Sequence, residues 1–178
     1  MISKIRGLLK QWLFTLLFRG RISFAGIPSM RRGASIKCKN GNMCTGRHFS
    51  MNTGAYCAIV NGGNLVVGDR VSINRNTVIV CHDSITIGSG CSIAPNVMIY
   101  DHDHKFDQNG IARGFNTAPV TIENNCWIGG GSIILRGSHI GEGCVIGAGC
   151  VVKGTIPPHS LVTASRELHV VPIEERSK

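Results

Sequence analysis

Histidines and carboxylates gather in one short polar segment of the sequence. The run Asp101-His102-Asp103-His104 alternates two carboxylates with two imidazoles. An imidazole with the ordinary pKa of about 6.5 can accept a proton at neutral pH, and a neighbouring carboxylate can orient it. Imidazoles and carboxylates are also zinc ligands, and His82 would complete a three-histidine set. The residue types therefore allow a general base, a metal site or a solvated loop.

The spacing within this segment restricts which groups can meet. In an extended segment, successive side chains point to opposite faces. Asp101 and Asp103 would then share one face, and His102 and His104 the other. A backbone carbonyl is therefore as good an orienting partner for either imidazole as a carboxylate is.

Aliphatic residues recur with a period of six, which predicts the scaffold that carries this segment. The repeating positions are Val67, Ile73, Ile79 and Ile85, then Ile87, Ile93 and Ile99, and finally Ile122, Ile128, Ile134, Ile140, Ile146 and Val152. A fixed period is typical of solenoids. Six residues fit a short strand plus a corner, with three units in each triangular turn. Successive turns would stack at about 4.8 Å, with the aliphatic residues along the axis.

The same repeat explains several of the eight cysteines. Four of them, Cys91, Cys126, Cys144 and Cys150, occupy the small position four residues after an aliphatic one. A cysteine there acts as a small interior hydrophobe. The sequence has no CxxC pair, so a zinc ribbon or a thioredoxin motif is unsupported, and we expect free thiols in the cytosol.

The period fails once, between Ile99 and Ile122. A regular solenoid that breaks for about twenty residues is expected to extrude a loop, here over about residues 100–119, and loops of this kind often carry function. The 178 residues suit one domain. We predict an N-terminal helix and lead-in over residues 1–30, the catalytic solenoid over 31–165 and a tail over 166–178.

The hexapeptide Ile-Gly-x-x-small-x resembles that of the left-handed β-helix acyltransferases. The segment Pro119–Pro158, PVTIENNCWIGGGSIILRGSHIGEGCVIGAGCVVKGTIPP, is similar to galactoside and maltose O-acetyltransferases. The resemblance implies an all-β, left-handed parallel β-helix that assembles as a homotrimer. It also implies acetyl-CoA as co-substrate, with no metal, and direct transfer to a sugar hydroxyl of a polysaccharide or glycolipid precursor.

The resemblance also assigns roles in the acceptor site. The family's catalytic histidine opens the extruded loop five residues after the last ladder position, which gives His104 here. His102 and Asp101 are then supporting residues. The family's acceptor-binding asparagine corresponds to Asn74, whereas its acceptor-binding aspartate is replaced by His82.

The donor side carries over in the same way. The family runs CoA along an edge of the prism between adjacent subunits. Gly130 and Ala148 are eighteen residues apart, one full turn, and are expected on that edge. Trp127 is expected to form a wall of the groove, and Lys153 and Arg166 to reach CoA phosphates.

Two further activities of this fold stay open. One is N-acetylation of an amino sugar or amino acid. The other is metal-dependent hydration, since zinc carbonic anhydrases share the solenoid and His82, His102 and His104 offer three ligands. Bound acceptor would distinguish the first, and metal content the second.

The net charge of +9 restricts the partners. Basic residues do not form a long run with interleaved aromatics, so nucleic acid is excluded as a partner, whereas the anion CoA fits. Apolar residues at helical spacing predict a helix over about residues 2–18, packed on the body or resting on a membrane. No signal cleavage site follows it. We expect a cytoplasmic protein, with peripheral contact at the inner membrane face as the alternative.

Overall fold

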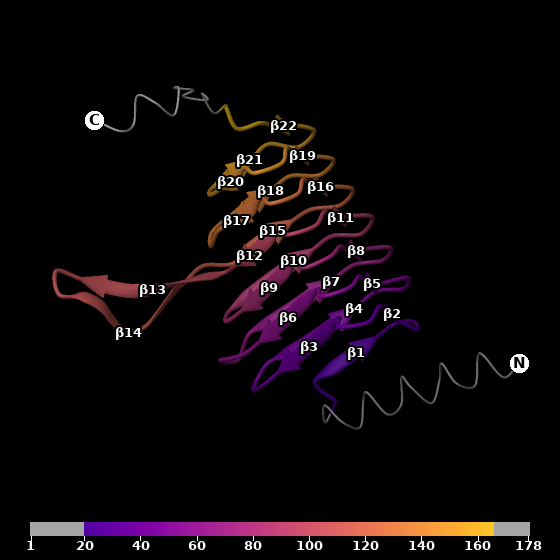
Figure 1. The fold of residues 1–178 in the computed structure, drawn as a ribbon, viewed down its shortest axis with the longest axis horizontal. Coiled ribbons are helices and arrows are strands. Elements are labelled where there is room, and N and C mark those ends of the chain that lie inside the picture. The colour runs from indigo at the N-terminus through magenta and orange to yellow at the C-terminus, as the bar shows by residue number, and fades with distance from the viewer. Residues whose placement is uncertain (1–19, 166–178) are drawn as a thin grey trace, which may run out of the picture.

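The computed structural model describes residues 20–165, which form a parallel β-helix with three sheets as its faces (Figure 1). Successive strands pass from sheet A to sheet B to sheet C and back to sheet A. Sheet A contains β1 (Ile22–Phe24), β4 (Asn42–Thr45), β7 (Asn64–Val67), β10 (Ser84–Ile87), β15 (Val120–Ile122), β18 (His139–Ile140) and β21 (Thr155–Ile156). Sheet B contains β2 (Ser29–Met30), β5 (Ser50–Met51), β8 (Ser72–Ile73), β11 (Ser92–Ile93), β16 (Trp127–Ile128), β19 (Val145–Ile146) and β22 (Leu161–Val162). Sheet C contains β3 (Ser35–Cys38), β6 (Tyr56–Ile59), β9 (Val78–Cys81), β12 (Met98–Tyr100), β17 (Ile133–Ile134) and β20 (Val151–Val152).

The aliphatic ladders fill the axis of the prism, as the six-residue period predicts. Ile99 pairs with Ile79 on one side and Ile134 on the other. Ile128 and Ile140 are 0% exposed, as are the other ladder isoleucines of the C-terminal coils. Stacking equal residues in register buries each one between two like neighbours, so the ladder is continuous.

Small polar side chains share this interior by bonding to the backbone. Ser132 Oγ donates to the Gly147 carbonyl at 2.9 Å, and Ser138 Oγ donates to the Leu135 carbonyl at 2.7 Å. Cys126 Sγ lies 3.1 Å from the Gly141 carbonyl. These hydrogen bonds offset the free-energy cost of removing a hydroxyl or thiol from water.

The eight cysteines are all free, and six are buried. Burial raises the pKa of Cys57 to about 12 and that of Cys91 to about 11. Both therefore stay thiols at neutral pH, and a thiol is a poor nucleophile. The interior cysteines are packing residues.

The solenoid begins before residue 31, where it was expected to start. Ile22 in β1 is fully buried and pairs with Met43 in β4, so the coil is already closed there. The expected helix over residues 2–18, the tail over 166–178 and Arg166 lie outside the described residues. Within residues 20–165, none of the secondary structure is a helix long and apolar enough to span a bilayer.

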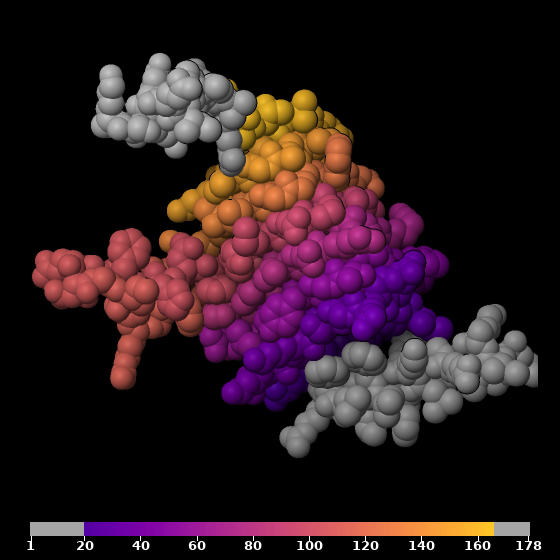
Figure 2. Space-filling view, viewed as in Figure 1, coloured from indigo at the N-terminus to yellow at the C-terminus, as the bar shows by residue number. Residues whose placement is uncertain are grey.

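The break in the period is a β-hairpin. Strands β13 (His102–Asp107) and β14 (Gly110–Thr117) pair antiparallel and project from the body at the corner where sheet C leads into sheet A (Figures 1 and 2). This confirms the extruded segment and gives it regular structure. Phe106 and Ile111 pair near its tip and are 79% and 80% exposed.

Removing one rung of the axial ladder should cost much of the stability of the fold. Ile140→Ala is expected to lower the free energy of unfolding by about 2–5 kcal/mol, because it leaves a cavity between fixed coils. Thr155→Ala, at an exposed position of the neighbouring strand β21, should change it by less than about 0.5 kcal/mol. Denaturant titration followed by circular dichroism measures both, and equal midpoints would contradict the ladder's role.

Candidate active site

Asp101 anchors the neck of the hairpin. Its side chain is fully buried at the corner between sheets C and A. The carboxylate accepts the backbone N–H of His82 at 2.9 Å and that of Asp83 at 2.7 Å. The Asp101 carbonyl accepts the N–H of Ala118 at 3.0 Å, which closes the neck. One side chain thus fixes both the preceding coil and the start of β13.

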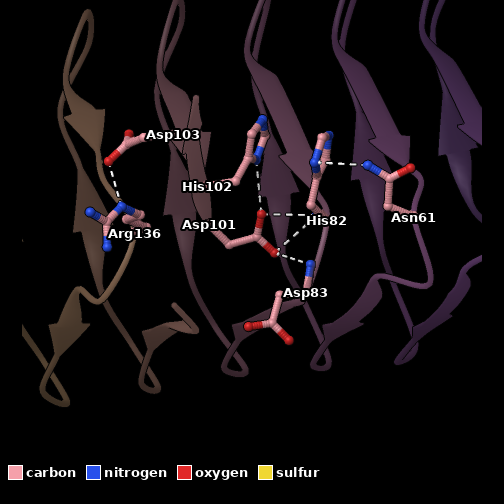
Figure 3. Close-up of polar contacts among 7 residues, drawn as sticks. All are labelled: Asn61, His82, Asp83, Asp101, His102, Asp103 and Arg136. Carbon is pink, nitrogen blue, oxygen red and sulfur yellow. Dashed lines mark hydrogen bonds and ion pairs between the residues drawn. The ribbon is translucent and has the colours of Figure 1, made fainter. Parts of the chain in front are cut away.

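His102 is oriented by this carboxylate. Its Nδ1 lies 3.1 Å from Asp101 Oδ1, and its side chain is 13% exposed. The ring stacks on that of His82, with centroids 3.6 Å apart and planes 4° from parallel. Figure 3 shows the two rings side by side above Asp101. His102 is therefore a fixed wall of the site.

His82 is held by a hydrogen bond from the preceding coil. The Asn61 amide Nδ2 lies 3.1 Å from His82 Nδ1. Burial lowers the pKa of His82 below its ordinary value, and the facing His102 lowers it further. The His82 ring is therefore neutral at neutral pH.

His104 is the exposed imidazole of the group. Its ring contacts the ring of Phe115, 4.7 Å away across the hairpin, and the same phenyl ring contacts His82 and His102. Neither nearby carboxylate reaches it, because Asp101 binds His102 and Asp103 forms an ion pair with Arg136. A carboxylate was expected to orient one of the two histidines. In the structure, the Asp101 carboxylate orients His102.

The same histidines were also expected to offer a metal site. Within residues 20–165, no group of three or more His, Cys, Asp or Glu side chains is arranged to hold a metal ion. His82 and His102 face each other in a stack, so their nitrogens do not converge on one point.

A second edge of the prism, between sheets B and C, carries the small residues expected to face CoA. Gly149 N donates to the Gly130 carbonyl at 2.9 Å, and Gly131 N donates to the Pro95 carbonyl at 3.0 Å. Gly130 and Ala148 therefore lie on adjacent coils of one edge, as their spacing predicts. Trp127 is 54% exposed on the outer face of sheet B.

The predicted site residues divide between the two edges. Asn74 follows β8 and lies on the B–C edge, where its amide contacts Asn52. His82 follows β9 and lies on the C–A edge, and β9 alone spans roughly 13 Å. Lys153 follows β20 and also lies on the C–A edge, away from Gly130. Within one chain the structure does not bring Asn74 to His82, or Lys153 to Gly130.

Three residues that contact the site were not predicted from the sequence. Asn61 is one coil before His82, so only the coil register reveals the contact. Phe115 faces His104 only once the hairpin register is known. Arg136 reaches Asp103 from the coil after the hairpin. The only sequence signal for any of these contacts is the separation of Asn61 and His82 by about one coil length. The sequence offers no such signal for Phe115 or Arg136.

Comparison with known proteins supports the repeat. The family model of the bacterial transferase hexapeptide (six repeats) matches residues 119–154. The chain is 38% identical over 122 residues to the galactoside O-acetyltransferase of Escherichia coli K12, covering 66% of this chain and 58% of that protein. It is 30% identical over 133 residues to the "Putative lipopolysaccharide biosynthesis O-acetyl transferase WbbJ" of the same organism, covering 69% of this chain and 68% of that protein.

A solved structure agrees with these relatives. The hexapeptide-repeat acetyltransferase VCA0836 of Vibrio cholerae, complexed with acetyl-CoA, superposes with a TM-score of 0.57 at 29% identity. The match covers 73% of this chain and 65% of that one. The chain spans 40–58% of the length of four further curated relatives. The repeat, the β-helix and these relatives together place the chain in the hexapeptide-repeat transferase family.

Proposed function

We propose that the chain is an acetyl-CoA-dependent O-acetyltransferase that modifies a sugar hydroxyl, with a polysaccharide or glycolipid precursor as acceptor. The observation that carries the proposal is the exposed His104 beside the fixed Asp101–His102 pair, at the only interruption of the described coils. The O-acetyltransferase names of two relatives support the same reaction.

His104 is the proposed general base. A base must contact the acceptor hydroxyl, and His104 is exposed, whereas His102 is stacked on His82 and hydrogen-bonded to Asp101. The hydroxyl oxygen forms the ester bond as the thioester C–S bond breaks, and the proton taken by His104 passes to the departing thiolate. No thiol of the protein takes part, which fits the raised pKa values of the buried cysteines.

The B–C edge fits an extended ligand such as CoA. A Cβ added at Gly130 would lie 3.3 Å from the Pro95 carbonyl oxygen, and one added at Gly131 would meet open space. Ala148 is exposed and Gly130 is partly exposed, so a ligand can approach the backbone along this edge, and Trp127 stands beside them. Acetyl-CoA would supply the acetyl group as a thioester. Lys153 would reach its phosphates from the C–A edge of another subunit.

A homotrimer would unite the two edges. The outer face of sheet C is an apolar row in register, formed by Tyr56, Val78, Met98, Ile133 and Val151. Three prisms that turn this face toward a common axis place the C–A edge of one subunit against the B–C edge of the next. His104 of one subunit would then face Gly130, Ala148 and Asn74 of its neighbour.

Assembly can be broken at this face. Ile133→Lys is expected to convert a trimer into a monomer and to abolish transfer, because three buried ammonium groups would meet without partners. Thr86→Lys, on the outer face of sheet A, should remain trimeric and active. Sedimentation velocity measures both, and a fully active wild-type monomer would overturn the shared site.

We further propose a cytoplasmic enzyme, with peripheral contact at the inner face of the membrane as the alternative. Activity itself is tested by following free CoA thiol from acetyl-CoA in the presence of neutral sugars, amino sugars or amino acids. Thiol release that requires a neutral sugar supports O-acetylation. If CoA thiol is released only when an amine acceptor is present, the reaction is N-acetylation and not O-acetylation.

A further inference from the structure

The hydrogen bonds of His102 fix which of its nitrogens carries the proton. Nδ1 faces the buried Asp101 carboxylate at 3.1 Å, and an ionised carboxylate only accepts hydrogen bonds. When the ring is neutral, its proton therefore resides on Nδ1 and its Nε2 presents a lone pair. No group of the described residues forms a hydrogen bond with this Nε2.

The hydrogen bond of His82 fixes the opposite arrangement. The Asn61 Nδ2 group only donates, so His82 Nδ1 accepts and the ring proton resides on Nε2. Burial lowers the pKa of His82, which keeps this ring neutral. His82 Nε2 thus presents an N–H donor, again without a described protein partner.

The two rings present these groups as one unit. They are parallel, with centroids 3.6 Å apart, and the edge of Phe115 packs against both. In each ring Nε2 lies on the side away from its bonded Nδ1 (Figure 3). The stacked rings therefore present one acceptor and one donor side by side.

We propose that His82 and His102 bind two neighbouring hydroxyl groups of the acceptor, which makes a vicinal diol the substrate class. One hydroxyl donates to His102 Nε2, and the adjacent hydroxyl accepts from His82 Nε2–H. An ammonium group has no lone pair for His82, and a carboxylate has no proton for His102. The inference rests on the proposed sugar acetylation and narrows its acceptor to a sugar with hydroxyls on adjacent carbons.

The test compares a methyl pyranoside that carries an adjacent diol with its two monodeoxy analogues. The wild type should prefer the diol by about tenfold or more in kcat/KM, the value of one hydrogen bond. His82→Phe keeps an aromatic ring for stacking but removes the donor, so it should lose most of this preference. A variant that keeps the full preference would overturn the proposal.

A second variant addresses the tautomer without removing the ring. Asn61→Asp places an acceptor at His82 Nδ1, which should move the ring proton to Nδ1 and leave two acceptors in the pair. Asn61 has φ 54°, a left-handed conformation that aspartate also adopts, so the fold should persist. Asn40→Asp, at φ 57° one coil earlier, is the matched control and should keep the wild-type preference.

Nitrogen-15 NMR of the imidazoles reads the tautomers independently of turnover. The expected wild-type result is Nε2–H for His82 and Nδ1–H for His102, and the opposite pair would overturn the proposal. Saturation-transfer NMR with the same sugars tests the diol site separately from the proposed transfer reaction. Preferential binding of the diol without acetyl transfer would reject the proposed reaction and keep the diol site, whereas equal binding of all three sugars would reject the diol site.

Discussion

Replacing His104 with alanine is expected to lower kcat by about 10²–10⁴-fold, the usual effect of removing a positioned general base. The KM for acetyl-CoA should stay near the wild-type value, because the B–C edge does not include His104. The fold should be unaffected, since the His104 ring is exposed and packs against Phe115 on the hairpin.

Initial rates over a range of acetyl-CoA concentrations provide the measurement. His48→Asn is the matched control, because His48 has φ 58°, which asparagine tolerates, and lies away from the hairpin. His102→Ala should cost less than His104→Ala. If His102→Ala is inactive while His104→Ala turns over normally, the base is His102. If neither change matters, the general-base mechanism is wrong.

Asp101→Asn should give the largest combined loss of stability and activity. The amide keeps the shape of the side chain, but its nitrogen cannot accept a hydrogen bond from the N–H of His82, the N–H of Asp83 or His102 Nδ1. At least one buried donor then loses its partner, which costs about 1–3 kcal/mol. His102 would no longer be held, and turnover should fall together with the free energy of unfolding.

Asp83→Asn is the matched control for this change. The Asp83 side chain is exposed, so the substitution should alter stability by less than about 0.5 kcal/mol. Urea denaturation of both variants, with transfer rates measured on the same samples, gives the two readouts. Wild-type stability in Asp101→Asn would show that the carboxylate does not anchor the neck.

The six-residue period predicted the coil because every turn requires an aliphatic side chain at the same interior positions. Ile128, Ile134, Ile140 and Ile146 point inward since each must stack on its equivalent one coil away. The start of the solenoid could not be placed in this way. Its first two coils have Phe24 and Thr45 where later coils have aliphatic residues, and its strands were recognisable only through their pairing.

The candidate site followed from sequence only in part. An extended segment was expected to place Asp101 and His102 on opposite faces, but the chain bends at Asp101, and its buried carboxylate forms a hydrogen bond with His102 Nδ1. The His82–His102 stack depends on the offset between two coils at one corner, which a pattern of aliphatic residues does not fix for the outward side chains. The division of Asn74 and His82 between two edges arises in the same way, because an assignment by position does not say on which edge of the prism a residue lies.

Product analysis tests the central proposal most directly. Wild-type protein, acetyl-CoA labelled with carbon-13 in the acetyl group and a methyl pyranoside with adjacent hydroxyls are incubated together, and the product is examined by mass spectrometry and NMR. The proposal predicts one labelled acetyl ester on a sugar oxygen, with none formed by His104→Ala at the same protein concentration. Label found only on nitrogen of an amine acceptor, or equal ester formation by His104→Ala, would contradict it.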